Sequence, residues 1–142
     1  MSTIKLIAID QDGTLLNDQG VVSERDVQAV QTAVSKGIQV IIATGKTYAS
    51  AVPVMAQLGI TAPGVFTQGL VICNADGSVR HEQALARETA VKLIQFADSH
   101  NLPQNAYCGA QILSSGAEKY RTLLHEKYHE PLLEAVGSLL DS

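Results

Sequence analysis

The chain has 142 residues, of which 46% are hydrophobic and 17% charged, and its formal net charge is −4. This composition is typical of a folded globular protein and excludes an intrinsically disordered one. The acidic balance gives no basic surplus, so we expect neither a nucleic acid nor a membrane as partner. No apolar run approaches the roughly 20 residues that a membrane-spanning helix needs.

The chain contains two cysteines, Cys73 and Cys108, which lie far apart and fit no metal-binding spacing. We expect two buried free thiols. The chain also opens without a signal-peptide pattern, and free thiols suit a reducing compartment. A cytoplasmic location is therefore expected.

The first part of the chain alternates strand and helix patterns. The apolar run Ile4–Ile9 stops at an aspartate and predicts a strand buried on both faces of a parallel sheet. A helix over Glu24–Lys36 is predicted next, with Ser23 as its N-cap and Gly37 as its stop. The apolar stripe of this helix is Val27, Val30 and Val34. The elements predicted after it are a strand over Ile38–Ala43, a helix over Tyr48–Leu58 ended by Gly59, and a strand over Gly64–Thr67. This order predicts an α/β fold with a Rossmann-like, doubly wound parallel sheet.

The pattern changes after the third strand. A hairpin is expected first, and then the beginning of a small α/β domain. The expected elements are hairpin strands over Leu70–Cys73 and Val79–Glu82, a helix over Arg87–His100 with Val91, Ile94 and either Ala97 or Phe96 inward, a strand or hairpin over Tyr107–Leu113 around Gly109, and a helix over Ala117–Tyr128. We accordingly predict an incomplete core domain over residues 1–84 and a partial second domain over residues 85–142.

Two aspartates, Asp10 and Asp12, follow the first predicted strand, with Gly13 and Thr14 after them. Ligands of open α/β sheets bind at the carboxyl ends of the strands. Two carboxylates so close together call for a neutralising cation, and oxygen ligands favour Mg²⁺. Each aspartate taken singly could instead be a turn former.

The second predicted strand ends in Thr44, Gly45 and Lys46. A hydroxyl, a backbone N–H and a cation at the start of a helix can hold an anion. Thr44 taken singly could instead be a helix cap. A carboxylate pair and an anion seat at adjacent strand ends together favour phosphoryl transfer.

The segment Asp10–Leu16 resembles the first motif, DxDGTLL, of the haloacid dehalogenase superfamily, and Ala43–Lys46 resembles its second motif. The order of Thr67–Leu70, a hairpin and a new α/β segment is similar to the Cof-like hydrolases, which carry an α/β cap there. The resemblance runs from Ile4 to about Tyr128. It implies a Mg²⁺-dependent phosphatase that acts on a small phosphorylated metabolite such as a sugar phosphate.

The resemblance also implies residue roles. Asp10 would be the nucleophile that forms an aspartyl-phosphate, and Asp12 would be the general acid and then the general base. The Asp10 carboxylate and the Asp12 backbone carbonyl would hold Mg²⁺. Thr44 and the Gly45 N–H would hold the phosphoryl oxygens, with Lys46, Gln68 and Gly69 on the substrate side.

The sequence departs from the family pattern in three places. Lys46 stands where arginine is usual and lacks its bidentate fork, and Gln68 stands before Gly69 where asparagine is frequent. The lysine of the third motif and the acidic residues of the fourth are missing. We therefore expect a fragment of a longer protein, whose first strand is an exposed edge.

Two further hypotheses stay open. The chain could be a non-catalytic fragment or pseudoenzyme that binds only metal and anion. His125–His129 reads H-E-x-x-H, the zinc-protease pattern in which two imidazoles share one helix face. A catalytic zinc needs a third protein ligand, and Pro131 ends this helix at once. The protease is thus the weaker of the two hypotheses.

Overall fold

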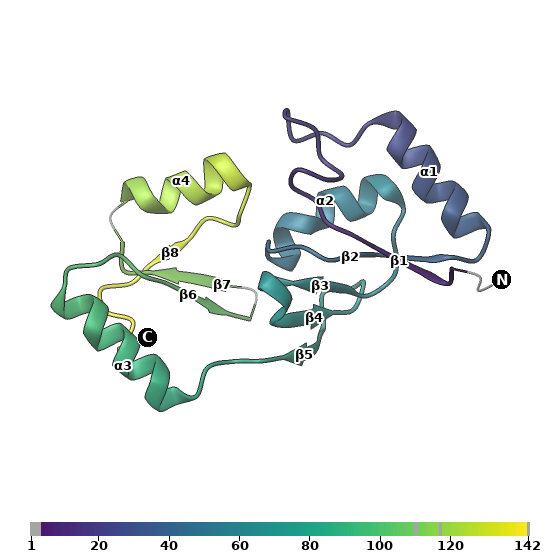
Figure 1. Cartoon of the computed structure of the whole chain (residues 1–142). Coiled ribbons are helices and arrows are strands. Elements are labelled where there is room, and N and C mark those ends of the chain that lie inside the picture. The colour runs from purple at the N-terminus through teal and green to yellow at the C-terminus, as the bar shows by residue number, and fades with distance from the viewer. Residues whose placement is uncertain (1–3, 110, 117, 142) are drawn as a thin grey trace. The chain divides into compact units, whose positions relative to one another are not determined.

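The structure is a computed structural model, and it describes residues 4–109, 111–116 and 118–141. The chain divides into two compact units, Met1–Glu82 and Gln83–Ser142 (Figure 1). Each unit is described by itself.

A pair of parallel strands begins the first unit. β1 (Leu6–Ile9) pairs with β2 (Gln39–Ile42), and Ile9 lies opposite Ile42. A parallel bridge between Ala43 and Val65 leads from β2 to β3 (Gly64–Phe66). The connections between these strands are α1 (Glu24–Ser35) and α2 (Tyr48–Leu58), which contact each other. The predicted strand and helix order and the α/β class are confirmed.

The helix boundaries follow from local capping. Ser23 caps α1, because its Oγ accepts a hydrogen bond of 3.2 Å from the Asp26 N–H. Gly59 ends α2 with a φ of 70°, the left-handed conformation that glycine adopts without strain. The predicted stripe of α1 is only partly right, because Val30 is buried whereas Val34 is 44% exposed.

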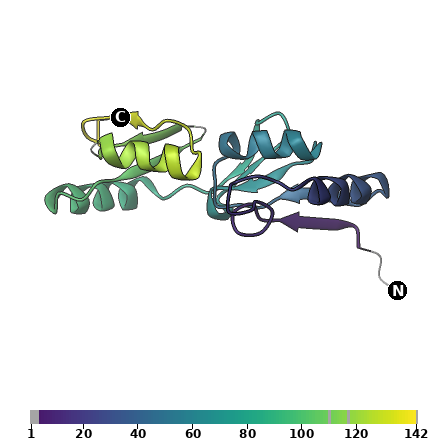
Figure 2. The same ribbon diagram turned by 90° about the horizontal axis from the view of Figure 1, so that it is seen from above.

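The strand β1 lies at an edge. Within the described residues it is hydrogen-bonded to β2 and to no other strand (the purple arrow in Figure 2), whereas the chain after β2 also forms the bridge to β3. Leu6 is 49% exposed as a result. The expectation of a strand buried on both faces is therefore wrong, and the expectation of an exposed edge is confirmed.

A three-stranded antiparallel sheet completes the first unit. The predicted hairpin is present as β4 (Val71–Cys73) and β5 (Val79–Glu82). β3 also pairs with β4, which the sequence did not indicate. The short 3-10 turn η1 (Thr67–Gly69) makes this pairing possible, because its residues have φ values of 52°, 56° and 91° and reverse the chain. The predicted third strand consequently stops at Phe66 rather than Thr67.

The core of the first unit contains apolar side chains from its strands, its helices and the connection between β1 and α1. Its fully enclosed members include Ile42 from β2, Leu58 from α2 and Phe66 from β3. Leu15, Leu16 and Val22 from the connection between β1 and α1 join the same cluster. That connection is therefore anchored, although it contains no regular helix or strand.

The second unit contains two helices and a small sheet. Its elements are α3 (Arg87–Ser99), β6 (Asn105–Cys108), β7 (Gln111–Ser114), α4 (Glu118–Tyr128) and β8 (Glu134–Ala135). β6 and β7 form the hairpin expected around Gly109, and β8 runs parallel to β7. The sequence did not indicate β8, because a two-residue strand leaves no periodic pattern. The expected start of the last helix, Ala117, lies outside the described residues.

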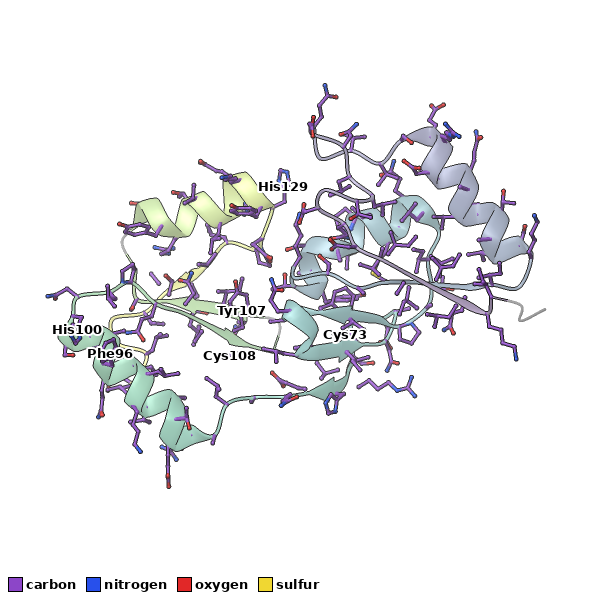
Figure 3. All side chains as sticks on the ribbon, in the orientation of Figure 1. Cys73, Phe96, His100, Tyr107, Cys108 and His129 are labelled. Carbon is purple, nitrogen blue, oxygen red and sulfur yellow. The ribbon has the colours of Figure 1, made fainter. Side chains whose placement is uncertain are left out.

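Of the two alternatives for the inner face of α3, Ala97 is buried, whereas Phe96 is 58% exposed and lies beside His100, with ring centroids 4.2 Å apart (Figure 3). Both cysteines are free, as expected, but only Cys73 is buried. The exposure of Cys108, on the short strand β6, corrects the expectation of two buried thiols. In the described part of the chain, no helix is long and apolar enough for a membrane span.

Candidate active site at the ends of the parallel strands

The parallel register of β1 and β2 brings the two predicted motifs together. Ile9 and Ile42 are partners in the ladder, and the Ala43 N–H donates a hydrogen bond of 2.9 Å to the Ile9 carbonyl. Asp10 and Thr44 consequently begin loops that leave the same end of the sheet, where both strands have their carboxyl ends. This arrangement follows from the topology alone.

The first loop is a tight turn built on one carbonyl. The Gln11 carbonyl accepts hydrogen bonds from the N–H groups of Thr14, Leu15 and Leu16 at 3.3, 3.0 and 2.9 Å. Gly13 has a φ of 73°, which suits glycine, and the buried Leu15 and Leu16 hold the turn against the core. The turn leaves Asp10 and Asp12 exposed at the strand end.

The second loop is fixed by its own polar groups. The Thr44 N–H donates to the Val65 carbonyl at 2.9 Å, and the Thr44 Oγ1 accepts from the Lys46 N–H at 3.3 Å. The N-cap of α2 is Thr47, whose side chain accepts from the Ser50 N–H. The alternative reading of Thr44 as the helix cap is therefore wrong. Thr44 is buried, and three residues separate it from the start of the helix.

An ion pair joins the two loops. The Lys46 Nζ lies 3.1 Å from the Asp12 Oδ1, and the two side chains are 8% and 56% exposed. The acidic turn and the Thr44 loop therefore face each other, as the sequence predicted. The cation expected for an anion seat is already engaged with a carboxylate.

A third segment closes against the second loop. The Thr67 N–H donates to the Lys46 carbonyl at 2.8 Å, so η1 is tied to the Thr44 loop. The Gln68 side chain fills the space directly above Gly45, where a β-carbon would lie 2.8 Å from the Gln68 Cδ. Thr67 and Gln68 both have positive φ, which is uncommon for residues other than glycine. The predicted substrate-side residues Gln68 and Gly69 thus belong to a constrained turn beside Gly45.

One buried polar residue was missed by the sequence analysis. Gln11 stands between Asp10 and Asp12 in the sequence, and its side chain is fully buried. Neither atom of its amide has a hydrogen-bond partner among the described residues. Burying an unpaired amide costs free energy, and glutamine in that position gives no periodic signal that could have predicted its burial.

The donor set fits a magnesium ion. The Asp10 carboxylate and the Asp12 backbone carbonyl are oxygen ligands at an exposed strand end, and Mg²⁺ is usually held by one or two carboxylates together with other oxygens, waters and substrate phosphate. The described residues contain no group of three or more His, Cys, Asp and Glu side chains arranged around one point. Asp10 and Asp12 stay the residues that we expect to hold such an ion.

The H-E-x-x-H pattern does not form its expected geometry. α4 ends at Tyr128, so His129 lies beyond the helix with a φ of 56°. The His125 Nδ1 is hydrogen-bonded to the Glu130 carbonyl at 2.7 Å. The two imidazoles consequently do not occupy successive turns of one helix, as a zinc protease requires.

Comparisons with known proteins agree with the fold and with the predicted family. The family model for haloacid dehalogenase-like hydrolases matches residues 7–136. The chain is 31% identical over 109 residues to phosphatase YwpJ of Bacillus subtilis, covering 77% of the chain and 38% of that protein. A structure of a haloacid dehalogenase-like hydrolase from Bacteroides thetaiotaomicron superposes with a TM-score of 0.83 at 22% identity, covering 99% of the chain and 54% of that structure.

The chain is also 30% identical over 142 residues to the chloroplastic endoribonuclease YBEY of Arabidopsis thaliana. That match covers 94% of the chain but 24% of the plant protein. The chain spans well under half the length of these two curated relatives. With the family model matching nearly its whole length, the chain belongs to the haloacid dehalogenase-like hydrolases.

Proposed function

We propose that the chain carries the nucleophile-bearing part of a magnesium-dependent phosphomonoester hydrolase that acts on a small phosphorylated metabolite such as a sugar phosphate. The observation that carries the proposal is the Asp12–Lys46 ion pair, which joins the acidic turn to the Thr44 loop across one strand end. The phosphatase name of its relative YwpJ supports the reaction type.

In the first step, a carboxylate oxygen of Asp10 attacks the phosphorus. A bond forms between this oxygen and phosphorus, and the bond from phosphorus to the substrate's ester oxygen breaks. Asp12, in its acid form, gives its proton to that departing oxygen, so the alcohol leaves neutral. The free position of Asp10 at the strand end suits a nucleophile that must reach a substrate.

In the second step, water attacks the aspartyl-phosphate. Asp12, now a carboxylate, accepts a proton from the water, and the bond between Asp10 and phosphorus breaks to give inorganic phosphate and free Asp10. The same residue therefore serves as acid and then as base.

The remaining residues hold the phosphoryl group. The Thr44 hydroxyl and the Gly45 N–H would contact its oxygens, and Gln68 and Gly69 would lie on the substrate side. A magnesium ion at Asp10 and the Asp12 carbonyl would supply charge neutralisation for the phosphoryl oxygens. We also propose a cytoplasmic location, since both cysteines are free thiols.

The test is hydrolysis of p-nitrophenyl phosphate and of hexose phosphates with Mg²⁺ and with EDTA. The substitution Asp10→Asn should lower kcat by on the order of 10³-fold or more, because no covalent intermediate can form. Asp18→Asn is a matched control with the same chemical change in an exposed position of the same loop. Equal activity of wild type and Asp10→Asn would contradict the proposal.

A non-catalytic protein that binds only metal and anion is the second candidate. It needs only the exposed carboxylates of Asp10 and Asp12 and the Thr44 loop, which this chain supplies. Calorimetric binding of Mg²⁺ and inorganic phosphate without turnover, in this chain and in any longer protein that contains it, would support this candidate. Turnover only in a longer protein would assign the chain to a complete phosphatase.

A further inference from the structure

Loss of the Asp12–Lys46 ion pair would cost more free energy at Lys46 than at Asp12. The lysine side chain is only 8% exposed, and a buried ammonium is costly unless an anion lies beside it. The Asp12 side chain is 56% exposed and keeps access to water. An anion that replaced Asp12 beside the ammonium would therefore leave the lysine paired and Asp12 solvated.

The backbone of Lys46 is held at both of its polar atoms. Its N–H donates to the Thr44 Oγ1 at 3.3 Å, and its carbonyl accepts from the Thr67 N–H at 2.8 Å. Any exchange of partners is consequently confined to the flexible end of the side chain. That end emerges from the same loop that holds Thr44 and Gly45.

We propose that Lys46 is an exchangeable counter-ion: it pairs with Asp12 when the anion seat is empty and transfers to the phosphoryl group when a phosphate binds. This inference rests on the proposed function and adds a task to it. The exchange releases Asp12 from its ion pair at the moment when substrate arrives. A phosphomonoester dianion, with two negative charges, competes for the ammonium better than a singly charged carboxylate does.

The test is a double-mutant cycle on the affinity for inorganic phosphate, measured by titration calorimetry at fixed Mg²⁺. The four proteins are wild type, Asp12→Asn, Lys46→Met and the double variant. Asp12→Asn removes both a general repulsion of the anion and the competing partner of Lys46, whereas in the Lys46→Met background it removes only the repulsion. The proposal therefore predicts that Asp12→Asn raises the affinity about fivefold more in the lysine background than in the methionine background.

Two further variants serve as controls. Lys46→Arg keeps the charge and should retain most of the difference, which shows that the cation rather than the lysine shape is responsible. Asp18→Asn makes the same charge change elsewhere in the first loop and should give no such difference. The melting temperature of each variant, followed by circular dichroism, identifies any protein that fails to fold.

The outcomes separate this inference from the proposed function. The exchange would be overturned if Asp12→Asn raised the phosphate affinity equally in both backgrounds, or less in the lysine background than in the methionine background. Either result would leave the anion seat in place. Absence of phosphate binding in folded wild type and in all variants would overturn the seat, and the exchange with it.

Discussion

The chain has two phenylalanines and two cysteines, and each unit holds one of each. In the first unit Phe66 is fully buried and Cys73 is 3% exposed. In the second unit Phe96 is 58% exposed and Cys108 is exposed as well (Figure 3). The same residue types therefore serve as core in one unit and as surface in the other.

The difference explains why the candidate site can be fixed in the first unit. A packed interior has few alternative side-chain arrangements, so the polar residues that it encloses keep their positions. These residues are Gln11, Thr44, Thr47 and Thr67, and the backbone of Lys46 is held among them. The second unit, by contrast, leaves most of its large apolar side chains exposed, including Leu85, Leu93, Leu102, Leu123 and Leu132.

The largest effect on stability is expected for Phe66→Ala. Its ring is fully buried and makes an edge-to-face contact with Tyr48, with centroids 5.4 Å apart. Removing it should lower the free energy of unfolding of the first unit by about 3–5 kcal/mol. Urea denaturation followed by circular dichroism gives this value. Phe96→Ala is the matched control and should cost less than about 1 kcal/mol, and similar losses for both would remove the contrast between the units.

The cysteine pair tests the contrast chemically. Burial, and then the negative charge of Glu82, raises the pKa of the Cys73 thiol, so less of it is thiolate near neutral pH. Labelling with Ellman's reagent at pH 8 should show two phases, with Cys73 slower by at least about tenfold because its attack needs local opening. Cys108→Ser should abolish the fast phase, and a fast phase that survived this substitution would contradict the exposure of Cys108.

Much of the first unit could be predicted from the sequence because its signals are local. Ser23 and Gly59 mark helix ends by capping chemistry, and the apolar runs mark the strands. The proximity of Asp12 to Lys46 also followed from the topology, because neighbouring parallel strands end at one edge.

The features that the sequence did not indicate depend on contacts between distant residues. The pairing of β3 with β4 requires the left-handed turn at Thr67 and Gln68, which neither residue type favours. The exposure of Phe96 depends on which face of α3 packs inward. Phe96 and Ala97 are adjacent in sequence, so the helical pattern alone does not decide between them. The burial of Gln11 follows from the tight turn around its own carbonyl rather than from its polarity.

Gln11 tests how strictly the packed first unit selects its side chains, because its buried amide adds no stability to the core. Both amide atoms are buried without a partner among the described residues. Gln11→Met keeps the length of the side chain and removes the unpaired groups, so it should raise the free energy of unfolding by about 1 kcal/mol. Gln19→Met, at an exposed position of the same loop, should change it by less than about 0.5 kcal/mol. A loss of stability in Gln11→Met would indicate that the amide has a partner such as a buried water.

An effect of similar, small size is expected at the contact between Gly45 and Gln68. A methyl group on Gly45 would overlap the Gln68 Nε2 and lie 2.8 Å from the Gln68 Cδ, so Gly45→Ala must push the amide aside. Because the obstacle is the far end of a flexible side chain, the cost in unfolding free energy should be only about 1 kcal/mol. Gln68→Asn shortens the side chain and tolerates the left-handed conformation of this position.

The double variant Gly45→Ala with Gln68→Asn should therefore recover most of the loss, with a coupling of about 0.5–1 kcal/mol in a thermal-melt cycle. At Gly137 in the second unit, an added β-carbon would meet no described atom within 4 Å and φ is not positive, so Gly137→Ala should be close to neutral. If the double variant recovers stability and Gly137→Ala is neutral, then the close packing around Gly45, rather than the loss of a glycine, determines the cost in unfolding free energy. An equal loss with and without Gln68→Asn would instead mean that Gly45 is required by its backbone, because the side chain above it would then have no part in the effect.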